Sequence, residues 1–448
     1  MSSGSKSTLS GILKTSIPAV LDLSSQTLTW LIEAIFIGHL SAAALAGVGV
    51  ALQVIILTFT IILTFVVGAS VIIIRYLGND DHWNANHVLA QALFMGIVLS
   101  FIIGIVWYFG SPYIFAIIKE DEPVARLFGI QYLQFIAFFT PFLITNFIAL
   151  GIMRMAGDTL LTMKVNLFAN ILNIAISPFL IFGWWIFPRL ETRGAAMAVC
   201  IAHTLAFFYT LYYLRSRKSV LFLSFRELTT LNLETFKKLF KLGIPTTIEQ
   251  LAWAIGQLIL SFFAARMGIV VLATHQVYIR VQSVLSMVYQ GFGIAGMTAV
   301  GKNLGAARQK QAVSAGNTAS RVVLVVAFTI AVLLFVFGRG IMAIFTNNET
   351  VVSYGASLIL VLALLQIPKG VNIVFSSNLR GGADLRWLMW LAISSVLLFE
   401  TFGSYSLAFW LKLSLEGLWL IQILDESFRL TLNYFRFRSD KWSRNEVV

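Results

Sequence analysis

The sequence is poor in charge and in cysteine. Only 12% of its 448 residues are charged, whereas a soluble globular protein carries roughly 25%, and the mean hydropathy is +0.85. These values exclude a soluble fold. The single cysteine, Cys200, excludes a disulfide framework and a cysteine-based metal site. The five histidines show no metal-ligand spacing, and no P-loop is present, so neither a metal enzyme nor a nucleotide-driven engine is expected.

Long apolar runs are what the sequence has instead. Residues 88–117, 316–345 and 351–378 are mainly apolar, and about 20 such residues cross a bilayer core. Each span must be a helix, because lipid offers no partner to an unpaired backbone group. We therefore predict an all-α membrane protein with twelve transmembrane helices. The predicted spans are 12–38, 45–74, 88–117, 128–152, 160–186, 195–214, 240–265, 270–300, 316–345, 351–378, 386–411 and 416–435.

The positions of the basic residues predict the orientation. With the N-terminus placed in the cytoplasm, 23 of the 32 Lys and Arg residues fall in cytoplasmic segments and seven in the opposite loops. Cytoplasmic loops of membrane proteins carry such an excess, so both termini are expected in the cytoplasm. The net charge of +12 then reflects topology, and no nucleic-acid partner is predicted.

The two halves of the chain repeat. Residues 16–22 resemble residues 243–249 at an offset of 227, and Leu77-Gly78 matches Leu304-Gly305 at the same offset. An even number of spans per repeat makes the repeats parallel. We predict two pseudo-symmetric six-helix lobes: an N-lobe (1–214), a basic cytoplasmic linker (215–241) and a C-lobe (242–448). Transporters built from repeats bind substrate near the repeat interface and alternate access by rocking.

Residues 153–158 match residues 379–384 in the same way, at an offset of 226. Leu45-Ala46 also matches Leu272-Ala273, at the offset of 227. Because these four matches follow one another in order at a nearly fixed offset, duplication is favoured over chance.

Acidic side chains inside spans are costly and usually functional. Asp22, Glu33, Glu249 and Glu400 fall inside the predicted spans. Asp22 and Glu33 share the first span, where eleven residues at about 100° each bring them to within roughly 20° of one face, about 16 Å apart. A carboxylate stripe beside a cavity suits a proton or sodium path. The alternative is a buried structural acid that pairs with Ser, Thr or Asn, and for Asp22, mirrored by Glu249, both interpretations stay open.

Two further features accompany these acids. Pro18 is expected to kink the first helix, although it is equally typical of an ordinary helix start. Asn170, Asn173 and Ser177 share one face of the span 160–186. Their oxygens suit a sodium ion or a protonated carboxyl group, but such residues also hold helices together.

Two basic residues also lie inside predicted spans. Lys369 is expected to form an ion pair with Glu249 or Glu400, or to extend toward a membrane surface. Arg280 has the same choices, and structural pairing is the expectation for both residues.

The chain resembles the multidrug and toxic compound extrusion (MATE) family of prokaryotic transporters. Within that family it resembles the DinF-like branch most. The resemblance extends over nearly all twelve spans. The segments that carry it are Glu33–His39, Leu45–Gly49, Arg154–Asp158, Asn173–Pro178, Leu272–Gln276, Val300–Ala306, Leu379–Gly381 and Gly417–Trp419.

The resemblance implies a cation-coupled antiporter, driven by H⁺ or Na⁺, that exports cationic or amphipathic drugs. It also implies a monomeric protein in the inner membrane. It identifies Glu33 as the coupling acid, Pro18 as the proline of a bending first helix, and Asn173, next to Ser177, as part of a fifth-span cation site. The substrate pocket is expected to include Gln26, Asp22, Asn146 and Asn170. No cofactor is implied.

Four departures from the family pattern favour protons and the N-lobe. Ser177 stands where an Asp usually precedes the proline, and Val199 where a threonine is usual, so a sodium site at Glu33 and Asn173 would be short of oxygen ligands. Lys369 stands where one subfamily has an Asp, and its ammonium group would repel a cation. Glu249 lies about a turn from that subfamily's seventh-span Glu.

Three alternatives are weighed against an antiporter. A lipid-linked oligosaccharide flippase of the same superfamily would need a wide cationic cleft, for which Arg280 and Lys369 are the in-span candidates. A membrane-embedded enzyme on lipid-linked substrates would need Asp/His clusters in a sizeable loop, and the outer loops are short. A receptor without transport would not explain parallel six-span repeats. We therefore expect a transporter and no enzymatic activity.

Overall fold

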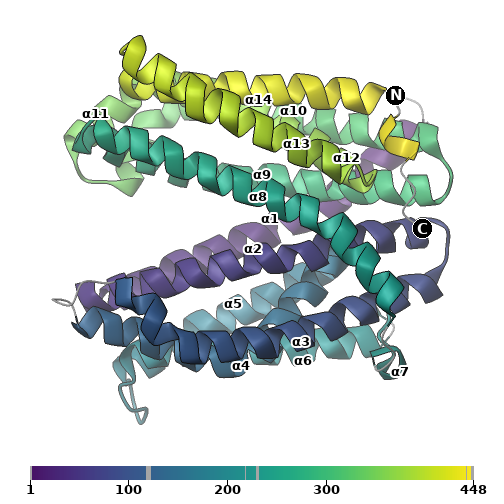
Figure 1. Ribbon diagram of the computed structural model, residues 1–448, viewed down its shortest axis with the longest axis horizontal. Coiled ribbons are helices and arrows are strands. Elements are labelled where there is room, and N and C mark those ends of the chain that lie inside the picture. Colours follow the sequence, from purple (N-terminus) through teal and green to yellow (C-terminus); the bar gives the residue numbers. More distant parts are fainter. Residues whose placement is uncertain (1–2, 118–122, 217, 229–231, 440, 445–448) are drawn as a thin grey trace. The chain divides into compact units, whose positions relative to one another are not determined.

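The computed structural model describes residues 3–117, 123–216, 218–228, 232–439 and 441–444, and these residues form helices and turns without a strand (Figure 1). The predicted all-α fold is confirmed. The long helices of the first half are α1 (Ser3–Gly38), α2 (Ala42–Gly78), α3 (His82–Ile114), α4 (Pro123–Met155), α5 (Thr159–Phe182) and α6 (Glu191–Arg215). Those of the second half are α8 (Leu233–Arg266), α9 (Ile269–Gly305), α10 (Gln309–Phe345), α12 (Ile359–Gly381), α13 (Leu385–Ser395) and α14 (Ser414–Arg438).

Eleven helical segments of the described chain are long and apolar enough to cross a membrane. The last of them joins α13 to two π-helical segments, Val396–Gly403 and Ser406–Trp410. The twelfth predicted span corresponds to α14, whose composition is too polar to qualify by hydropathy alone. Its charged residues are Glu416, Asp425, Glu426, Arg429, Arg436 and Arg438.

Two predicted boundaries differ from the structure. The segment expected as one span over 351–378 is divided into α11 (Glu349–Ser357) and α12. Near the break, the carbonyl of Gly355 accepts from the phenol of Tyr278 at 2.6 Å. In the predicted linker, residues 217 and 229–231 lie outside the described residues, α7 spans Phe225–Leu228, and α8 begins at Leu233.

The early start of α8 has a local cause. The side-chain oxygen of Asn232 accepts hydrogen bonds from the backbone N–H groups of Glu234 and Thr235, at 3.0 and 3.2 Å. An Asn at this position satisfies N–H groups that a helix start leaves unpaired. Residues 233–241 therefore form the first turns of a helix and carry their lysines on it.

The chain divides into two compact units. The N-terminal unit consists of Leu21–Ile73 and Asp81–Gly243, and the C-terminal unit consists of the residues up to Val20, Ile74–Asp80 and everything from Ile244 on. In the N-terminal unit α4 packs against α3 and α6, and α6 packs against α5. In the C-terminal unit α9, α10 and α12 pack against one another, and α14 packs against α12 (Figure 1). The helix α1 thus begins in one unit and continues in the other.

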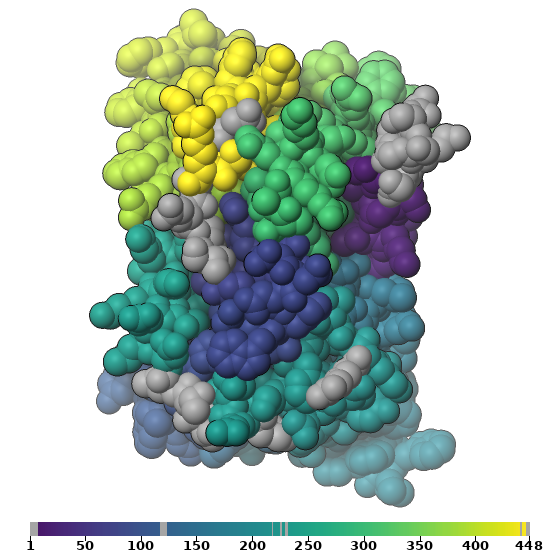
Figure 2. All heavy atoms as spheres, turned by 90° about the vertical axis from the view of Figure 1, so that its right-hand side faces the viewer, coloured from purple at the N-terminus to yellow at the C-terminus, as the bar shows by residue number. Residues whose placement is uncertain are grey.

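A close crossing joins the ends of α2 and α9 within the C-terminal unit (Figure 2). A Cβ atom added to Gly78 would lie 2.1 Å from the carbonyl oxygen of Lys302, and one added to Gly305 would lie 2.1 Å from that of Arg75. Only glycine allows backbones to approach this closely. Gly78 and Gly305 are matched positions of the sequence repeat, so the crossing is reciprocal.

We predict that Gly78→Ala and Gly305→Ala each destabilise the protein. The added methyl group must displace backbone atoms rather than a flexible side chain, and overpacking of this kind costs about 1–3 kcal/mol. Thermal unfolding of the purified protein in detergent measures the effect. Gly340→Ala is the matched control, because Gly340 lies in the same unit and a Cβ there meets nothing within 4 Å. Equal melting temperatures for all three variants would contradict the crossing.

Candidate coupling site

Polar side chains link α1 to α5 in the N-terminal unit, and Glu33 is at one end of this row. The side-chain amide of Asn173 donates a hydrogen bond to the Glu33 carboxylate. The Asn173 side-chain oxygen in turn accepts from the hydroxyl of Ser177, 3.2 Å away. Asn173 and Ser177 are buried at 3% and 1% exposure, and Glu33 is half-buried. The structure therefore brings the three residues predicted for ion coupling into one hydrogen-bonded chain.

Glu33 has no cationic partner among the described residues. The buried phenol of Tyr132 on α4 lies close enough to interact with it electrostatically. A carboxylate removed from water without a cation is unfavourable unless it binds a proton or a metal ion. The Glu33 carboxylate is thus a candidate to bind and release a proton or a metal ion.

Asp22 has a different environment on the same helix. Its carboxylate accepts from the Arg154 guanidinium at 2.8 Å, from the Asn166 amide at 2.7 Å and from the Gln26 amide at 3.4 Å. The side chain of Asp22 is fully buried. A carboxylate with a cation and two amides has little capacity left for a ligand, so this geometry favours the structural interpretation of Asp22. Gln26, predicted to line a pocket, contacts this ion pair.

The two remaining pocket candidates lie apart from Glu33. The amide of Asn170 donates to the Ser25 hydroxyl at 3.0 Å. Ser25 lies between Asp22 and Glu33 in the sequence. Asn146, on α4, accepts from the Thr210 hydroxyl of α6 at 2.7 Å and is 2% exposed. Asn146 therefore joins α4 to α6 and contacts none of the other predicted pocket residues in the hydrogen bonds of the described chain.

The C-terminal unit repeats the ion pair of Asp22. The Arg380 guanidinium lies 2.6 Å from the Glu249 carboxylate, at the positions that the sequence repeat matches with Arg154 and Asp22. Each pair joins the first long helix of a half to its fourth, α1 to α4 and α8 to α12.

The structural pairing expected of Lys369 is confirmed, but with another partner than predicted, and the pairing expected of Arg280 was wrong. Lys369 pairs neither with Glu249, which Arg380 occupies, nor with Glu400; its Nζ atom lies 3.8 Å from Glu426 on α14. Arg280, expected to be paired, is exposed and forms no ion pair within the described part of the chain. The reason is that α14 contributes acids nearer to Lys369 than those of α8.

A family model described as MatE matches residues 18–179 and 245–405. The chain belongs to the MatE family. One model matches once in each half, in agreement with the internal repeat. The DinF-like branch stays a prediction.

Curated relatives of this MatE protein cover nearly the whole chain. The uncharacterized transporter YisQ of Bacillus subtilis is 27% identical over 92% of this chain and 90% of its own length. A probable multidrug resistance protein NorM of Thermotoga maritima is 24% identical, covering 98% and 94%. The multidrug export protein MepA of Staphylococcus aureus is 24% identical, covering 84% and 82%.

Solved structures share the fold at 20% identity. A MOP superfamily transporter from Pyrococcus furiosus, described as having a binding pocket of reverse polarity, aligns with a TM-score of 0.88 over 98% of both chains. A MATE structure in a straight conformation gives 0.89 over the same shares. The likeness confirms two lobes of six helices, and it places α14 as the twelfth helix of this MatE protein.

Pro18 lies inside α1, just before the helix leaves the C-terminal unit at Val20. The turn around it packs on Gly291 of α9, where an added Cβ would lie 2.9 Å from the Val20 backbone nitrogen. Asp22, held by Arg154, separates Pro18 from Glu33. Pro18 and the Asp22–Arg154 ion pair thus lie on opposite sides of the point at which α1 passes from one unit to the other.

Several important residues of this MatE protein were missed in the sequence. In the sequence, Arg154 stands out only as part of a repeat motif, and Tyr132 carries no signal in a single sequence. Arg429 lies inside the predicted twelfth span. It belongs with the intramembrane bases, because its side chain is only 7% exposed. Asp425 and Glu426 lie at the middle of α14.

We predict that Asp22→Asn destabilises this MatE protein more than Glu33→Gln does. Removing the Asp22 charge leaves the Arg154 guanidinium without its carboxylate, and breaking a buried pair costs on the order of 3 kcal/mol. Unfolding in detergent measures both variants. Glu191→Gln is the control, because the Arg189–Glu191 pair at 3.4 Å is exposed and such pairs contribute little. Asp22→Asn combined with Arg154→Met should recover part of the loss, and equal stabilities would contradict a structural role.

Proposed function

We propose that this protein is a proton-coupled antiporter that exports cationic or amphipathic small molecules across the cytoplasmic membrane by alternating access. Glu33 is the group whose protonation is coupled to release of the exported molecule. Both termini lie in the cytoplasm in this proposal, and the working unit is a monomer surrounded by lipid.

One observation carries the proposal: Glu33 is an intramembrane carboxylate with hydrogen-bond support but no cation beside it in the described chain. Intramembrane acids of this kind mark proton and ion pathways. Asp22 on the same helix is already neutralised by Arg154, so it does not compete for the coupling ion. The relatives named for multidrug resistance and multidrug export support the class of exported molecule.

A proton is favoured over sodium by the way the amide of Asn173 is used. Its nitrogen faces Glu33 and its oxygen accepts from Ser177, so the amide oxygen is engaged away from the carboxylate. A hard cation needs several oxygen ligands, and Ser177 offers a hydroxyl that is already donating. A proton needs only the carboxylate itself.

The steps follow from the charge on Glu33. When the site is open to the outside, a proton adds to the carboxylate and removes the attraction for a cationic molecule, which leaves. The empty, protonated carrier then turns inward, where the proton is lost and the carboxylate can attract the next molecule. Each proton that moves down the membrane potential supplies about 2.3 kcal/mol per 100 mV.

A flippase for lipid-linked pyrophosphate is disfavoured by the state of the basic residues. Such a ligand needs cationic groups that are free to bind it. Arg154, Arg380 and Lys369 each have an acidic partner within 4 Å. Arg280 is exposed and has no such partner among the described residues, and one guanidinium makes a poor cleft for a pyrophosphate.

We expect Glu33→Gln to reduce coupled efflux at least tenfold while the protein still inserts and folds, because a glutamine cannot exchange a proton. Proteoliposomes loaded with a fluorescent organic cation, with H⁺ and Na⁺ gradients imposed separately, measure this. Glu416→Gln is the control, since Glu416 is exposed at the start of α14. Efflux by Glu33→Gln at the wild-type rate would contradict the assignment of Glu33 as the coupling acid. Wild-type efflux driven by a Na⁺ gradient alone would show that sodium, and not the proton, is the coupling ion.

A further inference from the structure

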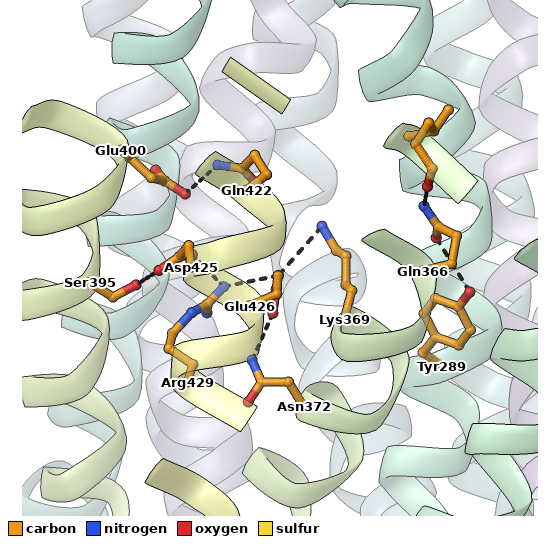
Figure 3. A network of polar contacts seen from close by, with 11 residues as sticks. Tyr289, Gln366, Lys369, Asn372, Ser395, Glu400, Gln422, Asp425, Glu426 and Arg429 are labelled. Atoms are coloured by element: carbon orange, nitrogen blue, oxygen red, sulfur yellow. Dashed lines mark hydrogen bonds and ion pairs between the residues drawn. The ribbon is translucent and has the colours of Figure 1, made fainter. Parts of the chain in front are cut away.

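The C-terminal unit contains a buried network of charges that the proposed function does not use (Figure 3). It brings together Glu400 from a π-helical segment, Lys369 from α12, and Asp425, Glu426 and Arg429 from α14. Asp425 and Glu400 are 0% exposed, Glu426 is 2% and Arg429 is 6%. These groups interact at the centre of a bundle, where charges must balance.

The cations of the network are held by two of its three acids. Arg429 lies 2.9 Å from Asp425 and 2.9 Å from Glu426, and its guanidinium stacks on the Trp253 ring at 3.7 Å. Lys369 lies 3.8 Å from Glu426. Ser395 donates to Asp425, and Asn372 donates to Glu426 at 2.8 Å. Asp425 and Glu426 are thereby paired.

Glu400 is the third acid, and it has no cation within ion-pair distance in the described chain. Its Oε1 atom accepts from the Gln422 amide at 3.1 Å, while its Oε2 atom is buried without a hydrogen-bond partner. With three carboxylates and two cations, the fully ionised network would have one uncompensated negative charge. A buried charge of this kind is removed by binding a proton.

The backbone around Glu400 is adapted to hold this carboxyl group. A Cβ atom on Gly256 of α8 would lie 1.5 Å from Glu400 Oε2, so the carboxyl group occupies the space that a side chain at 256 would fill. Glu400 lies inside the π-helical segment Val396–Gly403, and π-helical turns are frequent at functional sites. The site is therefore shaped by α8 and by the π-helical segment together.

We propose that Glu400 is a second proton-binding site of this protein, in the C-terminal unit and separate from Glu33. A hydronium ion transfers its proton to Oε2: one of its O–H bonds breaks as the carboxyl O–H bond forms, water is left behind, and the reverse step releases the proton. The titratable groups that face Glu400 are Asp425, Glu426, Arg429 and Lys369, while α8 contributes Gly256. Lys369 is the most exposed charged member of the network, at 12%.

The metal alternative is disfavoured by the same charges. Arg429 and Lys369 would repel a sodium ion in the network. A proton adds its charge directly to the carboxylate and needs no further ligand. The network thus fits a proton as its exchangeable cation.

Infrared difference spectra of the purified full-length protein, taken between alkaline and acidic buffers, test the proposal through the carbonyl stretch of protonated carboxyl groups. Glu400→Gln should lose one such band that Glu33→Gln retains, and Glu416→Gln should retain all of them. The bands of Glu33 and Glu400 are assigned by separate variants. A failure of the Glu33 proposal therefore does not change the result expected for Glu400. A Glu400→Gln spectrum equal to that of Glu416→Gln overturns the inference, and so does a band that disappears only in Asp425→Asn.

A second variant tests the charge balance and serves if Glu400→Gln does not fold. Lys369→Met removes one positive charge, so the network should bind one further proton and gain a second carbonyl band. The double variant Lys369→Met/Glu400→Gln should return to a single band from the network. An unchanged Lys369→Met spectrum contradicts the inference.

Discussion

A carboxylate inside a bilayer remains charged only beside a cation, and this requirement divides the intramembrane acids of the protein into two groups. Asp22, Glu249 and the Asp425–Glu426 pair each have a guanidinium within 3 Å. Glu33 and Glu400 have amide support but no cation in the described residues. One acid of the second group lies in each half of the chain. Ion pairing compensates the charge of the first group and leaves the second without a cation of its own, which is the ground for the two proton-binding proposals.

The paired acids also tie the first long helix of each half to a neighbouring helix. Arg154 fixes α1 to α4 at Asp22, and Arg380 fixes α8 to α12 at Glu249. The segment of α1 up to Val20 belongs to the C-terminal unit and packs on α9. Pro18 lies where the helix passes from one unit to the other. Glu33 lies in the part of the helix that follows the Asp22–Arg154 ion pair.

Much of this molecule follows from its sequence, for identifiable reasons. Apolar length predicts the helices, because lipid leaves the backbone no other structure. The joining of Glu33 to Asn173 and Ser177 follows from helical spacing together with the family resemblance. The pairing of Lys369 could not be predicted, since it depends on which face of α14 packs against α12. The start of α8 was missed for a different reason: a lysine-rich stretch resembles a loop until the capping Asn232 is taken into account.

The polar α14 shows why hydropathy alone fails at such a site. A lone charged residue at the centre of a span costs about 2.5–3.5 kcal/mol, so Asp425, Glu426 and Arg429 would keep an isolated α14 out of the membrane. Within the unit, Arg429 pairs with both Asp425 and Glu426. Lys369 of α12 supplies the second positive charge that these two carboxylates need. This helix is therefore stable only in the assembled bundle. The same interdependence leaves Glu400 as the one acid of the network that must take its positive charge from water.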